Sequence, residues 1–302
     1  MAQQFPRWQG VFPAITTQFT VDGTLDHDST AKHIEVLVDS GINGLIVGGS
    51  LGENQTLAPE EKRQLVKRAV EVAGKRIPVM TGVAESSTAA ACAFVKDCEA
   101  LGAAGFMVMP AMIYKADATE AETYFRTVGT ATKLPWMLYN NPVGYTVDIT
   151  SPQLQRLVDM PNLVAIKESS ANTRRITELR IALGDRLQIF SGVDDLILQS
   201  AALGIDGWVA GSGIAFPKEN QYFWDLMQAG KWEAARQMYL WFYPLMKLDT
   251  NLKFVQYIKL AVQEVGLGKE YVRAPRLTLR GREREEVLAV IHHGIANRPK
   301  LG

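Results

Sequence analysis

The sequence predicts a (β/α)8 barrel (a TIM barrel) followed by an all-helical C-terminal extension, and two observations support this fold class. Short, nearly continuous apolar runs alternate with longer amphipathic segments up to Ala229, and after Gly230 only helical patterns follow. Apolar runs of this kind are typical of parallel strands that are buried on both faces. We therefore expect a catalytic barrel over residues 1–229 and a helical extension over residues 230–302.

Eight apolar runs are expected to form the strands of the barrel. They are Val11–Thr17, Gly44–Val47, Ile77–Thr81, Gly105–Met109, Trp136–Tyr139, Leu163–Lys167, Leu187–Phe190 and Gly207–Ala210. Eight strand–helix units in about 230 residues favour a closed barrel over an open doubly wound sheet.

The segments between these runs have helical periodicity and helix-end signals. Pro59 begins one of them, and Glu60 and Glu61 follow where the helix dipole is positive. The barrel helices are expected at His27–Ser40, Pro59–Ala73, Thr88–Leu101, Thr119–Thr132, Pro152–Val158, Thr173–Leu183, Asp195–Leu203 and Pro217–Ala229. Those of the extension are expected at Trp232–Met246, Leu252–Val265 and Glu283–Asn297.

Composition and charge argue against several classes of partner. Lys+Arg and Asp+Glu both total 32, so the net charge is zero and the basic excess typical of nucleic-acid binding is missing. No apolar run reaches the roughly 18 residues of a membrane-spanning helix, and the N-terminus lacks the apolar core of a signal peptide. Cys92 and Cys98 fit no metal or CxxC motif, and we expect buried, reduced thiols in a cytoplasmic protein.

The turn after the second strand has the composition of a small-anion site. Its sequence is GGSLGE, from Gly48 to Glu53. Consecutive glycines allow backbone N–H groups to face an anion, and Ser50 adds a hydroxyl. A carboxylate fits better than a nucleotide, because the P-loop and GxGxxG spacings are both missing. A tight turn without a ligand is the alternative interpretation.

Two strand ends carry residues suited to imine chemistry. Lys167 closes an apolar strand, although lysines are rarely buried. Desolvation favours the neutral amine, which carbinolamine and imine formation require. Tyr139 ends the neighbouring strand, about 4.8 Å away in a sheet, and can relay protons. A lysine in a structural ion pair and a tyrosine that packs at the rim are the alternatives. No histidine lies at a strand end, so we expect no metal.

Five motifs in order resemble the dihydrodipicolinate synthase/N-acetylneuraminate lyase family: GGSLGE, LYNNP, VAIKESS, FSGVDD and GWVAGSG. The resemblance covers almost the whole chain, to about Arg298. It implies a class I lyase on a (β/α)8 barrel that needs no cofactor, binds pyruvate or another 2-oxo acid and is commonly a homotetramer. We therefore expect a homo-oligomer, either a tetramer or a dimer.

The resemblance also assigns roles to individual residues. It implies that Lys167 forms the Schiff base, that Tyr139 shuttles protons and that Ser50 binds the substrate carboxylate. Leu51 replaces the second hydroxyl of the usual turn, so carboxylate binding relies on Ser50 and on N–H groups of the turn, which includes Gly49. The pyruvyl pocket is lined by positions that match Gly192 and Val209.

Two departures from the family bear on the substrate. Synthases of the family carry an Arg shortly after YN-P, but here Val143-Gly144-Tyr145 follows. They also place a Tyr pair after the fourth strand, and Tyr114 comes too late to match it. We therefore predict that this chain is not a 4-hydroxy-tetrahydrodipicolinate synthase. Its specificity is expected on the loops after strands four, five and eight, at Met112, Tyr114, Tyr145 and Ser212.

The favoured hypothesis is a Schiff-base lyase, an aldolase or a hydro-lyase, that acts on a short hydroxylated 2-oxo acid through an imine on Lys167. An alternative is a deaminase of a hydroxylated pyrroline carboxylate in hydroxyproline breakdown, which would release ammonia. A 4-hydroxy-tetrahydrodipicolinate synthase and a non-enzymatic keto-acid sensor are further alternatives. The joint presence of Lys167, Tyr139 and Ser50 argues against the sensor.

Overall fold

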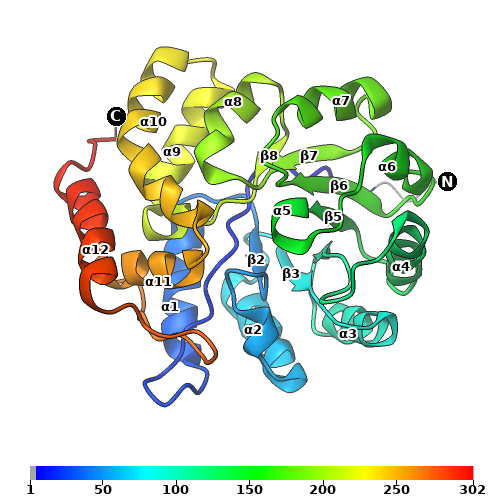
Figure 1. The fold of residues 1–302 in the computed structure, drawn as a ribbon, viewed down its shortest axis with the longest axis horizontal. Helices are drawn as coiled ribbons and strands as arrows, with labels where there is room; N and C mark the ends of the chain where they lie inside the picture. Colours follow the sequence, from blue (N-terminus) through cyan, green and yellow to red (C-terminus); the bar gives the residue numbers. More distant parts are fainter. Residues whose placement is uncertain (1–4, 302) are drawn as a thin grey trace.

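The computed structural model describes residues 5–301 and contains an eight-stranded parallel sheet (Figure 1). Neighbouring strands follow the order β1-β8-β7-β6-β5-β4-β3-β2. The strands are β1 (Gly10–Val11), β2 (Leu45–Val47), β3 (Val79–Val83), β4 (Gly105–Val108), β5 (Trp136–Asn140), β6 (Leu163–Glu168), β7 (Gln188–Ser191) and β8 (Gly207–Trp208). A parallel bridge between Ala14 and Ile46 joins the first strand region to β2 and closes the barrel. The predicted fold class is confirmed.

The first and last strands are shorter than the apolar runs predict. Beyond Val11 the chain continues beside its neighbours through separate hydrogen bonds rather than an unbroken ladder. The N–H of Phe12 donates to Trp208 O at 2.8 Å, and that of Ile15 donates to Ile46 O at 3.0 Å. The apolar run therefore marks the buried path of the chain, whereas the regular strand occupies only its beginning.

The helices follow the predicted segments within one or two residues at most ends. The barrel helices are α1 (His27–Asp39), α2 (Pro59–Ala73), α3 (Thr88–Ala100), α4 (Ala118–Thr130), α5 (Pro142–Tyr145), α6 (Ser151–Leu157), α7 (Arg174–Leu183), α8 (Ile197–Ala202) and α9 (Pro217–Gln228). The short helix α5 is not predicted by the sequence pattern. Asn141 caps it by accepting a hydrogen bond from Gly144 N, and Pro142 occupies its first turn.

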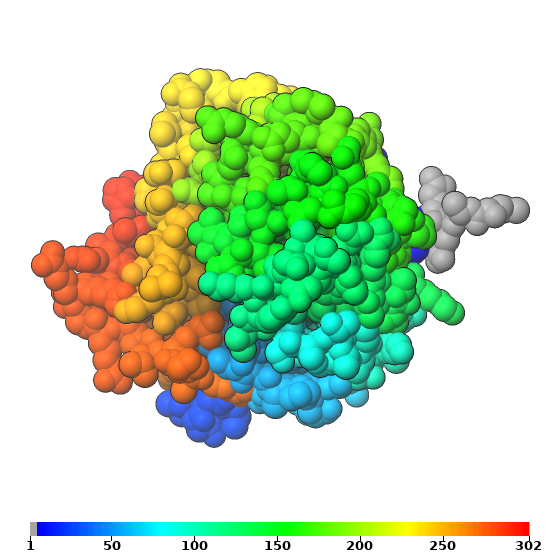
Figure 2. Space-filling view, turned by 45° about the vertical axis from the view of Figure 1, so that its right-hand side comes forward, coloured from blue at the N-terminus to red at the C-terminus, as the bar shows by residue number. Residues whose placement is uncertain are grey.

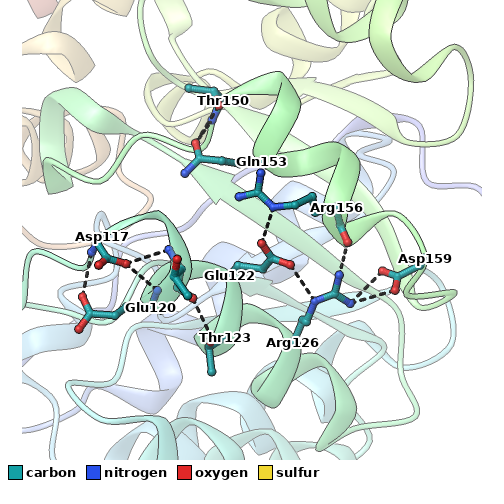
Figure 3. Close-up of polar contacts among 10 residues, drawn as sticks. Asp117, Glu120, Glu122, Thr123, Arg126, Thr150, Gln153, Arg156 and Asp159 are labelled. Carbon is teal, nitrogen blue, oxygen red and sulfur yellow. Dashed lines mark hydrogen bonds and ion pairs between the residues drawn. The ribbon is translucent and has the colours of Figure 1, made fainter.

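Side-chain contacts link α4 to α6 at the outer surface (Figure 3). Asp117 caps α4, and Glu120 completes a capping box. Further along α4, Glu122 accepts from Arg156 at 2.6 Å and Arg126 pairs with Asp159 at 2.9 Å. Because these groups remain accessible to solvent, we expect each pair to contribute less than about 1 kcal/mol. They join α4 to α6 and to the turn after it.

The C-terminal helices pack against one side of the barrel (Figure 1). They are α10 (Trp232–Met246), α11 (Phe254–Glu264) and α12 (Gly281–Ala296), with a short 3-10 segment, η4 (Lys247–Thr250), after α10. Phe242 and Ile258 belong to the same hydrophobic core as Phe223 of α9 and Ile214 after β8. The division at residue 230 therefore remains a proposal, since the extension and the barrel share one core.

A buried ion pair joins the extension to the turn after β2. Lys259 Nζ of α11 lies 2.8 Å from Glu53 Oε1, and both side chains are fully buried. Glu53 has a left-handed backbone (φ 57) and also accepts from Arg273 N at 3.1 Å. The pair therefore anchors the end of the turn that carries Ser50.

Lys259→Met should destabilise the protein by about 3–5 kcal/mol, because it leaves the Glu53 carboxylate buried without its main counter-charge. Chemical denaturation followed by circular dichroism measures this change. Arg236→Met is the matched control, since Arg236 forms an exposed pair with Glu233 on α10 and its loss should cost below about 1 kcal/mol. Equal losses for the two variants would contradict the assigned role of the buried pair.

Three further features concern partners and location. No helix within residues 5–301 is both long enough and apolar enough to span a bilayer. Cys98 is buried as predicted, but Cys92 is only partly buried. In the same residues no three or more His, Cys, Asp or Glu side chains gather as a metal site. The cytoplasmic location and the homo-oligomeric state stay predictions.

Candidate active site

A cavity of about 760 Å³ lies at the C-terminal ends of the strands. Its wall includes Lys167, Tyr139 and Ser50, the three residues that the sequence singles out as a reacting group, a proton carrier and a carboxylate ligand. Gly192 and Val209 also line it, as predicted. The structure therefore brings together residues from β5 and β6 and from the segments that follow β2, β7 and β8.

Lys167 lies inside the barrel, with 7% of the residue exposed. It forms no ion pair within the described residues, so the alternative of a structural salt bridge loses its support. Burial lowers the pKa of its amine, although Asp249, Tyr145 and Asp194 oppose that shift. A Cβ at Gly192 would come within 2.2 Å of Lys167 Cε, which explains why glycine occupies this wall.

Tyr139 lies directly opposite Lys167 in the paired strands β5 and β6. The Lys167 Nζ lies 4.1 Å from the centre of the Tyr139 ring. The phenol accepts a hydrogen bond from Asn141 Nδ2 at 3.1 Å. Burial raises its pKa to about 12, so the group carries its proton at neutral pH and can donate it. The predicted proximity of Tyr139 and Lys167 is present in the structure.

Tyr145 occupies a different place from the one that the sequence suggests. The loop after β5 folds back as α5, so the Tyr145 hydroxyl forms a hydrogen bond with Ser50 Oγ. Its ring also packs edge-on against Tyr139, with centroids 5.6 Å apart. Tyr145 therefore lies at the carboxylate end of the cavity, near the reacting groups, and not at the distal end where specificity was expected.

The turn after β2 has the geometry of a small-anion site. Gly48 has a left-handed backbone (φ 62), and a Cβ on Gly82 would lie 2.6 Å from Gly48 O, so two glycines let the turn approach β3 closely. Within residues 5–301 the N–H groups of Ser50 and Leu51 donate to no protein acceptor. Together with the Ser50 hydroxyl they can bind a carboxylate. Gly49 supports the turn but is not part of the cavity wall.

Three predicted specificity residues do not reach the cavity wall. Tyr114 is 58% exposed and donates to Glu120, because Ile113 has a left-handed backbone (φ 76) that turns the loop toward α4. Ser212 is buried and donates to Asp194. Met112 lies just outside the cavity wall, where its Sδ is 3.9 Å from Nε2 of the cavity residue Gln55.

The C-terminal extension contributes cavity residues that the sequence does not reveal. Lys247, Asp249 and Arg276 all line the cavity. Lys247 Nζ lies 3.3 Å from Asp195, and Arg276 lies 3.8 Å from Glu53. The cavity wall therefore contains two cationic side chains, Lys247 and Arg276, although no Arg follows Pro142 directly. Strand-end reasoning missed these residues because they come from η4 and from the segment between α11 and α12.

Comparison with known proteins gives one consistent family. The profile described as "Dihydrodipicolinate synthetase family" matches residues 7–294. A 4-hydroxy-tetrahydrodipicolinate synthase from Desulforamulus reducens is 31% identical over 94% of this chain and 96% of its own. The synthase structure from Methylacidiphilum fumariolicum SolV has a TM-score of 0.92 at 29% identity, and covers 96% of this chain and 97% of its own.

Another similar structure contains a bound ligand. It is the chloride-inhibited dihydrodipicolinate synthase of Acinetobacter baumannii complexed with pyruvate, which is 28% identical with a TM-score of 0.89 and covers 95% of this chain and 98% of its own. The family match and the buried lysine at the mouth of the closed barrel together identify an enzyme of the class I, Schiff-base-forming lyases. The chain belongs to the dihydrodipicolinate synthetase family.

Proposed function

We propose that this enzyme acts on a short hydroxylated 2-oxo acid through an imine on Lys167. The observation that carries the proposal is the desolvated Lys167 amine, which faces the Tyr139 ring and shares a cavity with the unpaired N–H groups of the turn after β2. A neutral amine, a proton donor and a carboxylate ligand are the three groups that imine formation with a 2-oxo acid needs.

The geometry supports an order of events. The Ser50 hydroxyl and the N–H groups of Ser50 and Leu51 hold the C1 carboxylate. The Lys167 amine attacks C2 and gives one of its protons to the C2 oxygen. The Tyr139 phenol supplies the second proton, and the oxygen leaves as water. The resulting iminium accepts electrons, so a C3 proton or the C3–C4 bond can then break. The tyrosinate left on Tyr139 is positioned to take up the proton.

Tyr145 contacts two groups of the proposed mechanism. Its hydroxyl forms a hydrogen bond with Ser50 and its ring packs against that of Tyr139, so it holds both side chains in place. We assign Tyr145 a positioning role toward Ser50 and Tyr139, in place of the specificity role that its loop suggests.

Tyr145→Phe should lower kcat about threefold to tenfold, the equivalent of one neutral hydrogen bond of about 0.5–1.5 kcal/mol. The order of preference among 2-oxo acids should stay the same, because the change lies at the end of the site that all of them share. Steady-state kinetics on three substrates of different length test this. A reordering of kcat/KM values with unchanged kcat for the best substrate would return Tyr145 to a specificity role.

The proposal is tested by trapping the imine. Incubation with pyruvate and borohydride should add a reduced pyruvyl group to the peptide that contains Lys167, as read by mass spectrometry. Lys247 provides an internal control, since it lines the same cavity but is about half exposed and paired with Asp195. Labelling of Lys247 in place of Lys167, or the absence of any adduct, would overturn the proposed function.

A second candidate is 4-hydroxy-tetrahydrodipicolinate synthase, which is favoured by the names of the relatives and by Lys247 and Arg276 in the cavity wall. Against it, α5 presents Val143 and Gly144 where an Arg would hold the second substrate. Condensation of pyruvate with aspartate semialdehyde at kcat/KM above about 10⁴ M⁻¹s⁻¹ would favour the synthase. Ammonia release from a hydroxylated pyrroline carboxylate would instead identify the deaminase.

A further inference from the structure

A buried polar cluster lies behind the two reacting residues, Tyr139 and Lys167. Because successive side chains of a strand point to opposite faces, the residue after each of them points away from the cavity. These residues are Asn140 and Glu168, which are both buried and are paired in the register of β5 and β6. Asn140 Nδ2 donates to Glu168 Oε2 at 3.1 Å, and neither residue lines the cavity.

The side chain of Asn140 also closes the loop that follows it. Its Oδ1 accepts from Ile149 N at 2.9 Å, and its Nδ2 donates to Asp148 Oδ1 at 3.2 Å. The amide thus uses its acceptor and both of its N–H groups, and only one orientation satisfies the backbone donor and the two carboxylates. The loop of residues 141–149 therefore leaves β5 and returns to it at a single side chain.

Further contacts secure the outer edge of this cluster. Arg175 of α7 forms an ion pair with Asp148 and donates to Ile149 O at 3.3 Å. Glu168 Oε1 accepts from Ser170 N at 2.7 Å, so both oxygens of this carboxylate are occupied. Figure 2 shows the green segment of α6, which follows the loop, at the surface beside the teal segment of α4. The loop is therefore tied to β5, β6 and α7 at once.

This loop makes two contacts with the active site. Asn141 Nδ2 donates to the Tyr139 hydroxyl at 3.1 Å. The Tyr145 hydroxyl, at the end of α5, forms a hydrogen bond with Ser50. A reacting group that is misplaced by about 1 Å can lose about 10²-fold in rate, so the position of the loop matters for proton transfer.

We propose that Asn140 and Glu168 are positioning residues for the proton transfers at C2 and C3 of the substrate. They act through the loop of residues 141–149, because this loop holds the hydroxyl of Tyr139. The inference rests on the proposed imine mechanism. Neither side chain reaches the cavity, so changes in the cluster should slow proton transfer and leave the amount of imine at saturating substrate nearly the same.

Pyruvate alone is a sufficient probe of this step. A bound pyruvyl imine that gives a C3 proton to the tyrosinate of Tyr139 and regains a proton from it exchanges its methyl protons for deuterium in D₂O. Proton NMR measures this exchange, and borohydride trapping at saturating pyruvate measures the imine on Lys167. Asn140→Asp should slow the exchange at least about fivefold, because a carboxylate oxygen then faces Asp148 and Glu168. The trapped imine should change less than about twofold.

A reversed hydrogen bond separates positioning from a general loss of packing. Glu168→Gln alone should slow the exchange at least about twofold, since one amide oxygen cannot replace the two carboxylate oxygens that accept from Asn140 and Ser170. In the Asn140→Asp background the same change should speed the exchange at least about threefold, because the new amide donates to the new carboxylate. The substitution at Glu168 therefore has opposite effects in the two backgrounds.

Asn162→Ala is the matched control, since it removes a buried amide from the opposite end of β6. Asn162 directly precedes that strand, and its Nδ2 donates to Gly129 O at 2.8 Å. This variant should lower the melting temperature but change the exchange rate less than about twofold. If it slows the exchange as much as Asn140→Asp does, the inference is overturned.

Three other results would also overturn the inference. They are a smaller slowing in Asn140→Asp than expected, no gain in the double variant, and a wild type that forms the imine without exchanging its C3 protons. Should Asn140→Asp not fold, Glu168→Gln decides alone, because less than twofold slowing there contradicts the positioning role. Failure of the wild type to form any imine on Lys167 would instead refute the proposed function.

Discussion

Lys167→Met should abolish turnover and imine trapping while the barrel stays folded. The side chain of methionine has a similar volume and can occupy the buried position beside Tyr139. It has no amine, so the covalent route closes, and losses of about 10⁴–10⁶-fold in kcat are typical when a nucleophile is removed. Turnover of the best 2-oxo acid and mass-spectrometric detection of a borohydride adduct are the two measurements.

The wild-type rate of adduct formation should also depend on pH in a defined direction. The reactive neutral amine accumulates as the pH rises through the pKa of Lys167. Because burial lowers that pKa, the rate should reach its plateau at a lower pH than for a solvated lysine. Lys247→Ala serves as the control and should keep both the adduct and the profile. Retention of more than about a tenth of wild-type kcat in Lys167→Met would exclude the imine mechanism.

Much of the barrel and its chemical centre are predictable from the sequence for a physical reason. Parallel strands buried on both faces need continuous apolar runs, so a lysine that closes such a run stands out. Once Lys167 and Tyr139 are placed at adjacent strand ends, the pleat of neighbouring strands brings them together, as the paired register shows. The same reasoning places Ser50 at the mouth, because it lies in the turn that follows β2.

The rest of the site depends on loop conformation, which periodicity does not encode. Tyr145 turns inward because Asn141 and Pro142 start a helix of 4 residues, too short to leave a repeating pattern. Tyr114 turns outward at the left-handed Ile113. Asp249 is the clearest omission, since it comes from η4 and its approach depends on the packing of α10 against the barrel. No local feature of the sequence around Asp249 marks it as a cavity residue.

Tyr139→Phe should lower kcat about 10²–10⁴-fold, the usual contribution of a group that transfers protons. Phenylalanine keeps the ring that lies 4.1 Å from Lys167 Nζ and packs against Tyr145, so the fold and the position of the lysine should persist. The lost hydroxyl is the proton donor to the C2 oxygen and the acceptor of the C3 proton. KM should change little by comparison, because Ser50 and the turn after β2 hold the carboxylate. Stopped-flow kinetics of imine formation and of the later step should both slow, whereas the melting temperature should stay close to that of the wild type. A loss below about threefold in kcat would leave Tyr139 as a packing residue and move the proton transfer to Tyr145 or to water.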